Sequence, residues 1–154
     1  MNKIKEIQND VIFRLNPIPV PFRSRISFCV AQITLILALN SSKSSCSEIK
    51  IHTITSALTK RKEFNDLIAY CKNPNIYMNF APNLDPCVTK AIRFALKDNI
   101  FIKLGNGNYK LTNKGKTFAE NIKSYGLMTD EIEALEELGT TLTEKLLKRL
   151  IKGR

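Results

Sequence analysis

The side chains best suited to chemistry in this sequence are the lysines and arginines between residues 86 and 125. This stretch, about a quarter of the chain, holds eight of them against two acidic residues, which leaves six of the chain's ten net positive charges. Clustered cations bind polyanions, of which nucleic acid is the simplest. The same charge also fits an anionic membrane surface or an acidic protein face. The stretch is therefore a predicted binding surface.

These cations fall on a predicted helix, a predicted hairpin and the start of a further helix. On a helix that begins at Pro86, the 100° step per residue puts Lys90, Arg93 and Lys97 within about 60°, with apolar side chains opposite. Such a ridge suits the DNA major groove, where lysine and arginine contact phosphates and guanine edges. The predicted DNA-binding residues are Lys90, Arg93, Lys97, Lys103, Lys110, Lys114 and Lys116.

Two other interpretations of this surface stay open. Runs of charge are often only solvated faces. Helical modules of this type also dock to proteins without touching DNA. Phe94 falls beside the cationic ridge and away from the apolar stripe, which favours docking to a protein. Charge alone does not separate these interpretations.

Residues that would support catalysis are sparse. The single histidine, His52, has no partner at metal-ligand spacing, and the cysteines at 29, 46, 71 and 87 include no C-x-x-C pair. The glycine-rich phosphate loops and the nucleophile elbow are missing. We therefore expect no enzyme, no catalytic residue, no metal, no cofactor and no small-molecule substrate. The cysteines are interpreted as reduced thiols of a cytoplasmic protein.

The elements that must position the cations follow from turn and capping signals. Asp85 at the N-cap and Pro86 at the first helical position predict a helix over 86–98. A hairpin follows, with strands over 99–104 and 109–112 joined by a glycine-containing turn. The threonine that ends the second strand caps another helix. This order is typical of a winged helix.

Three helices are predicted ahead of that segment. The first, over 25–40 with Ser24 as its cap, is apolar nearly all round and too short to span a membrane, so we expect a buried central helix and no membrane partner. Helices over 47–58 and 61–72 follow a serine-rich loop. The alternation over 76–80 indicates a short strand.

Two helices are predicted after residue 126, one capped by Thr129 and one opening at Thr141 with capping-box spacing. The second has a broad apolar stripe that includes Leu142, Leu146 and Leu150. This stripe either packs on the preceding helix or docks in a partner's groove.

Together these patterns predict a mostly α (α+β) protein with one core. An extended proline-containing strap occupies 1–24, and a winged helix-turn-helix domain with a β-hairpin wing occupies 25–125. A C-terminal helical hairpin occupies 126–154.

Three groups of residues carry a family resemblance: Phe13–Pro17 with Pro21–Arg25, then Ile51–Leu58, then Asn108–Gly115. With them the chain resembles the small middle component of bacterial ABC-three-component systems, including the Lamassu-type defence operons. The resemblance implies a non-enzymatic accessory subunit of an antiphage or anti-plasmid complex, which bridges an SMC-like ATPase and an effector such as a nuclease. Expected partner-binding residues are then Phe22, Phe94, Leu142, Leu146 and Leu150, with double-stranded DNA near the basic ridge. The alternative is a stand-alone winged-helix transcriptional regulator.

Overall fold

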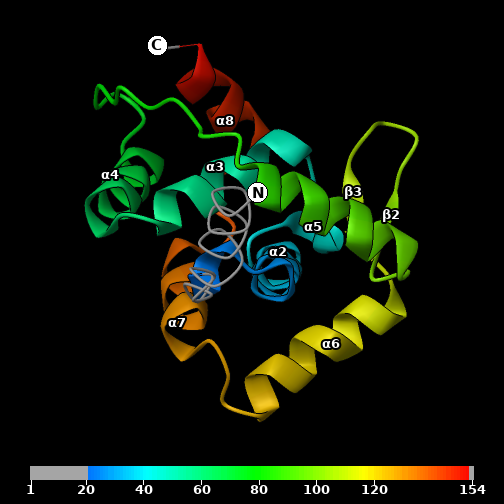
Figure 1. Cartoon of the computed structure of the whole chain (residues 1–154). Helices are drawn as coiled ribbons and strands as arrows, with labels where there is room; N and C mark the ends of the chain where they lie inside the picture. The colour runs from blue at the N-terminus through cyan, green and yellow to red at the C-terminus, as the bar shows by residue number, and fades with distance from the viewer. Residues whose placement is uncertain (1–20, 153–154) are drawn as a thin grey trace, which may run out of the picture.

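Helices dominate residues 21–152, the part of the chain that the computed structural model describes (Figure 1). In chain order the elements are η1 (Phe22–Ser24), α2 (Ile26–Leu39), η2 (Ser42–Ser44), β1 (Ser45–Cys46), α3 (Glu48–Leu58), α4 (Arg61–Lys72), α5 (Pro86–Lys97), β2 (Phe101–Lys103), β3 (Tyr109–Leu111), α6 (Asn113–Ser124), α7 (Thr129–Leu138) and α8 (Glu144–Ile151). The predicted mostly α fold with a small sheet is confirmed. The predicted extended strap over 1–24 lies almost wholly outside the described residues, and its last three residues form the 3-10 helix η1 and not extended chain.

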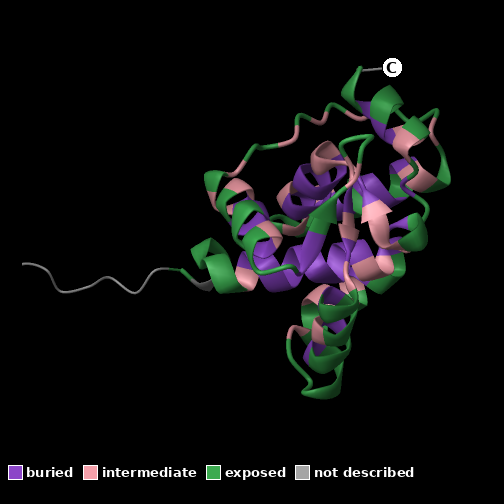
Figure 2. Ribbon diagram, turned by 90° about the vertical axis from the view of Figure 1, so that its right-hand side faces the viewer, coloured by how far each residue is buried: buried purple, intermediate pink, exposed green. Residues whose placement is uncertain are grey.

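Helix α2 is the centre of the fold, as its apolar composition predicts. All its residues from Cys29 to Leu37 are buried. Leu35 and Ile36 pack in one core with α3, α4, α7 and α8, while Ile33 and Leu37 pack in a second core with α5 and the sheet. Figure 2 shows the buried residues gathered around this helix. One helix thus connects both cores. Among residues 21–152, no helix is long and apolar enough to cross a membrane.

The sheet has three antiparallel strands in the order β1-β3-β2. Its inner face, which includes Phe101, Tyr109 and Leu111, is buried in the second core. The hairpin of β2 and β3 is where the sequence predicts it. Strand β1 lies in the segment predicted as a serine loop, because two residues are too few to show a strand periodicity.

The predicted caps of α2 and α7 are wrong. Arg25, not Ser24, is the N-cap of α2, and its side chain makes no capping hydrogen bond. Ser24 instead ends η1, where its N–H donates to the carbonyl of Pro21. Met128, in a left-handed conformation, precedes α7, so the predicted cap Thr129 is the first helical residue. Both helices are held by packing, which replaces the missing caps.

The predicted strand over 76–80 is not a strand. The alternation itself is present, because Met78 and Phe80 pack partly against the first core while Tyr77 is 80% exposed. A strand also needs a neighbour with which to form hydrogen bonds, and the structure describes none beside this segment. It crosses the surface as extended chain between α4 and α5.

The C-terminal helices complete the core and do not form a hairpin. Figure 1 shows α7 and α8 on different sides of α3. Leu142 and Leu150 are 0% and 2% exposed, and Leu146 is half-buried against the same core. The prediction that these three leucines dock a partner is therefore wrong, because they pack in the chain's own interior. The Tyr70 hydroxyl donates to the carbonyl of Leu146 at 3.3 Å, which fixes α8 on α4.

The start of α8 is also tied to a distant segment. Thr143, not the predicted Thr141, caps the helix by accepting from the N–H of Leu146. The Glu144 carboxylate accepts from the N–H of Ser47 at 3.0 Å and from its hydroxyl at 2.9 Å. A local capping box is thus replaced by a contact with the start of α3.

Candidate nucleic-acid interface

Helix α5 begins as predicted and presents a cationic ridge. The Asp85 carboxylate accepts from the N–H of Cys87 at 2.8 Å, and Pro86 is the first helical residue. Apolar residues of the stripe are buried: Val88, Ala91, Ile92 and Ala95. The ridge cations are exposed: Lys90, Arg93 and Lys97. The predicted division of this helix into an apolar face and a cationic face is confirmed.

The ridge has no neutralising acid within residues 21–152. The ion pairs of that range include none of Lys90, Arg93 or Lys97, and none of Lys103, Lys110 or Lys116. A DNA duplex carries a layer of condensed cations along its phosphates. Lysine and arginine side chains that contact the phosphates would release those cations to solvent, which favours binding.

Lys114 differs from the other predicted DNA-binding residues. Its Nζ lies 3.2 Å from the Asp98 carboxylate and 2.9 Å from the Asp98 carbonyl. Asp98 is the C-cap of α5, so this lysine connects the first turn of α6 to the end of the ridge helix. Its charge is partly neutralised, and its evident role is to position the two helices.

A close backbone contact also fixes α6 against the hairpin. Thr112 caps α6 as predicted, with its hydroxyl oxygen accepting from the N–H of Gly115 at 3.1 Å. The Ile100 carbonyl accepts from the Thr112 N–H at 3.1 Å. A Cβ on Gly115 would lie 2.3 Å from that carbonyl oxygen. Only glycine allows this approach without displacement.

The hairpin turn is closed by backbone and side-chain hydrogen bonds. The Leu104 N–H donates to the Asn108 carbonyl at 2.8 Å, and Asn106 Oδ1 accepts from the Asn108 N–H at 3.0 Å. Gly107 has φ +87°, a conformation that other residues rarely adopt. Gly105, Asn106 and Gly107 are exposed, so the turn presents no bulky side chain to a partner.

The two hairpin lysines point to opposite faces of the sheet. Lys103 pairs with Tyr109 across the strands, and its Nζ lies 5.7 Å from the centre of that ring. Lys110 pairs with Ile102 on one side and Ser45 on the other. Because residues alternate between the faces of a strand, a flat surface cannot meet both lysines in the same way.

Two phenylalanines, Phe94 and Phe22, are predicted to bind a partner, and the structure describes the side chain of only the first. Phe94 is 54% exposed beside the cationic ridge, where the helical periodicity places it. Ile102, which the sequence does not single out, is 45% exposed on the outer face of the sheet. Phe22 begins η1, and its side chain lies outside what the structure describes.

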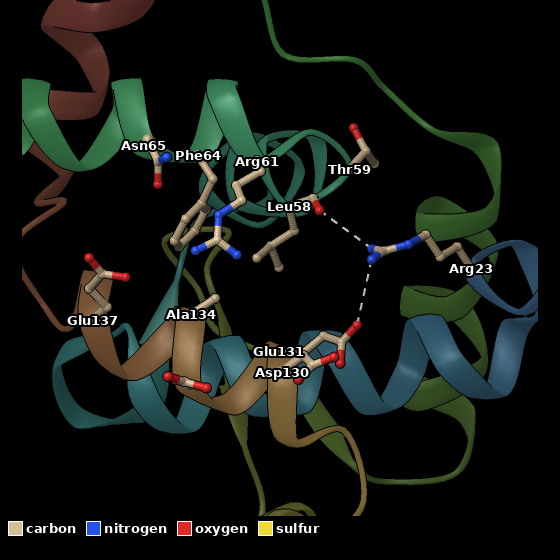
Figure 3. A pocket seen from close by; sticks show the side chains of 11 residues that line it. Arg23, Leu58, Thr59, Arg61, Phe64, Asn65, Asp130, Glu131, Ala134 and Glu137 are labelled. Atoms are coloured by element: carbon tan, nitrogen blue, oxygen red, sulfur yellow. Dashed lines mark hydrogen bonds and ion pairs between the residues drawn. The ribbon is translucent and has the colours of Figure 1, made fainter.

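The largest group of acidic residues lies away from the ridge. Helix α7 has five carboxylates and no cation, and Figure 1 places it across α2 from the hairpin. Between α7 and α4 lies a cleft of about 430 Å³. Figure 3 shows Arg23 at its edge, where it donates to the Leu58 carbonyl at 3.4 Å and lies 3.7 Å from the Glu131 carboxylate. The chain is therefore electrically asymmetric.

A partly buried polar cluster connects α3 to the sheet. The Tyr109 hydroxyl donates to the Glu48 carboxylate at 3.1 Å, and His52 Nε2 lies 3.7 Å from that carboxylate. Burial and the Glu48 charge raise the pKa of Tyr109. His52 is 2% exposed. This cluster supports the sheet from behind.

Comparison of the chain with protein families, with curated proteins and with solved structures gave no match. The resemblance to ABC-three-component systems therefore stays a prediction.

Proposed function

We propose that this chain is a winged-helix module that binds double-stranded DNA, with α5 as the helix that enters the major groove. The observation that carries the proposal is the exposed ridge of Lys90, Arg93 and Lys97, which has no ion-pair partner within residues 21–152. It lies on the helix immediately before the hairpin. In winged helices that position belongs to the recognition helix.

The topology supports this assignment. A helix, a strand, further helices and a hairpin follow one another in the chain, and β1 pairs with β3. In the proposed winged helix, α2 is the supporting helix and the turn around Gly107 is the tip of the wing. Helix α4 and the extended segment 73–85 would be an insertion ahead of α5.

The geometry suggests how the contacts divide. The ridge contributes three exposed cations along one helix face, which suits phosphates on both sides of a groove as well as guanine edges. The narrow glycine turn allows the wing backbone to approach a phosphate. Because the hairpin lysines face apart, we expect only one of them to meet the same duplex as the ridge.

The test is a charge reversal of the ridge, K90E/R93E/K97E. Each lost phosphate contact lowers the slope of log affinity against log salt by about 0.9, so the variant's slope should be shallower by roughly 2.7. At physiological salt we expect duplex affinity to fall at least roughly 100-fold. Fluorescence anisotropy with labelled duplex, at several salt concentrations, measures both quantities.

A matched control separates the ridge from net charge. The variant K62E/K72E/K148E makes the same charge change at exposed positions on α4 and α8. It should bind DNA within a few-fold of the wild type. Equal losses in both variants, or wild-type binding that does not respond to salt, would contradict the proposal.

We further propose that the module acts without catalysis in the cytoplasm, as an accessory subunit of a defence complex with an SMC-like ATPase and an effector nuclease. The family resemblance supports this assembly, and the exposed Phe94 beside the ridge supports a protein contact. Purification of the tagged chain from its native host should recover a large ATPase, and Phe94→Ala should weaken that recovery. A homodimer that binds a palindromic operator would favour the transcriptional regulator instead.

A further inference from the structure

Two cysteines from distant parts of the chain meet where α2 and α5 cross. Cys29 lies in the first turn of α2, and Cys87 is the second residue of α5. Their sulfur atoms are 3.0 Å apart although 58 positions separate them in the sequence. A disulfide bond is about 2.05 Å long, so a movement of about 1 Å would join them. Within the described range, Cys46 and Cys71 have no such sulfur neighbour.

The two thiols differ in access to solvent. Cys29 is 2% exposed, whereas Cys87 is half-buried at the surface end of the pair. Burial, together with the neighbouring Cys87, raises the pKa of the Cys29 thiol to about 12. A disulfide reagent from solvent would therefore meet Cys87 first.

Both sulfurs also contact the backbone of η1. Cys29 Sγ lies 3.3 Å from the Arg23 carbonyl, and Cys87 Sγ lies 3.2 Å from the Ser24 carbonyl. In the reduced protein these thiols are the donors, since a carbonyl oxygen only accepts. A disulfide has no S–H group, so oxidation would remove the two hydrogen bonds that the thiols donate to the carbonyls of η1.

We propose that Cys29 and Cys87 are a redox pair, which forms a disulfide that links α2 to the first turn of α5. The oxidant is a low-molecular-weight disulfide of the glutathione class. This proposal does not depend on DNA binding.

The reaction has two exchange steps. The Cys87 thiolate attacks one sulfur of the small disulfide, so a mixed disulfide forms and one small thiolate leaves and takes a proton. The Cys29 sulfur then attacks Cys87 Sγ, and the second small thiolate leaves with the proton that Cys29 gives up. One protein disulfide forms, one small disulfide is reduced to two thiols, and two electrons pass from the cysteine pair to the oxidant.

The cross-link has a measurable physical effect. It closes a loop of 58 residues, and constraining the unfolded chain in this way should raise Tm by roughly 8–16 °C for a protein of this size. It also fixes the start of the ridge helix on the central helix.

The experiment treats the full-length protein with oxidised glutathione and maps its disulfides by mass spectrometry without reduction. We expect a loss of about 2 Da per chain, a Cys29–Cys87 peptide, the higher Tm, and reversal of all three by dithiothreitol. A stable glutathione adduct on Cys87, or a cross-link that involves Cys46 or Cys71, would overturn the proposal.

Two variants complete the design. C46S/C71S keeps the proposed pair and should behave as the wild type does. C87S removes the half-buried partner and should lose both the cross-link and the rise in Tm. Because the mapping of the wild-type protein decides the chemistry by itself, the conclusion stands even where a variant folds poorly.

Discussion

Substitution of Gly115 by alanine tests the contact that holds α6 against the hairpin. In an ordinary helix this change is stabilising by about 1 kcal/mol, because glycine has the larger conformational freedom in the unfolded chain. Here the new Cβ would lie 2.3 Å from the Ile100 carbonyl oxygen and 2.8 Å from a methyl group of Leu111. We therefore expect the sign to reverse.

The magnitude follows from what must move. The Ile100 carbonyl accepts from both the N–H and the hydroxyl of Thr112, each at 3.1 Å. Displacing α6 lengthens those hydrogen bonds, at about 1 kcal/mol each, and crowds Leu111, at about 2 kcal/mol. Alanine has the better helix propensity, which offsets about 1 kcal/mol of this cost. The free energy of unfolding should therefore fall by about 3 kcal/mol. This corresponds to a fall in Tm of roughly 6–12 °C.

Urea denaturation followed by circular dichroism measures the free energy of unfolding of G115A. Gly105→Ala is the matched control, because nothing lies within 4 Å of a Cβ at that position, and it should change the free energy of unfolding by less than about 0.5 kcal/mol. If G115A were as stable as G105A, the close approach of α6 to the Ile100 carbonyl would be refuted. The placement of the hairpin beside the ridge would then need to be revised.

The other two predictions concern the core. Burial lowers the pKa of Lys50, so its charged form is disfavoured in the folded state. Lys50→Met should therefore stabilise the protein by about 1 kcal/mol at pH 7. This gain should shrink as the pH rises toward the ordinary lysine pKa of 10.5, because the wild-type lysine then loses its charge. Urea titrations at two pH values measure the difference. Leu147→Ala, at a site that is 0% exposed, should cost about 3 kcal/mol, whereas Ile151→Ala, at 43% exposure, should cost under about 0.5 kcal/mol. Equal costs for the two α8 variants would mean that this helix is not part of the core.

Much of the secondary structure was predictable because its signals are local. Asp85 and Pro86 define a helix start through short-range geometry alone. The 3.6-residue period separates the α5 stripe from its ridge without any knowledge of the neighbours. The glycine turn and Thr112 place the hairpin and the next helix in the same way.

The failures share a different cause. Ser24 and Thr129 have the right chemistry for caps, but the entry of each helix is set by what it packs against. Residues 76–80 alternate correctly and still form no strand, because a strand depends on a partner that the local sequence does not reveal. The leucine stripe of α8 shows the same limit, since an amphipathic face looks identical whether it meets its own core or another protein.

By itself the sequence determined the helices of the fold, the hairpin and the cationic face of α5. These depend on residues within a few positions of one another, where backbone sterics and helical periodicity decide the outcome. Only the tertiary structure decided which distant groups meet: β1 with β3, Lys114 with Asp98, Glu144 with Ser47, and the sulfurs of Cys29 and Cys87. Such contacts depend on how the helices pack around α2. A periodic pattern shows which face of a helix is buried, but it does not show which distant residue that face contacts.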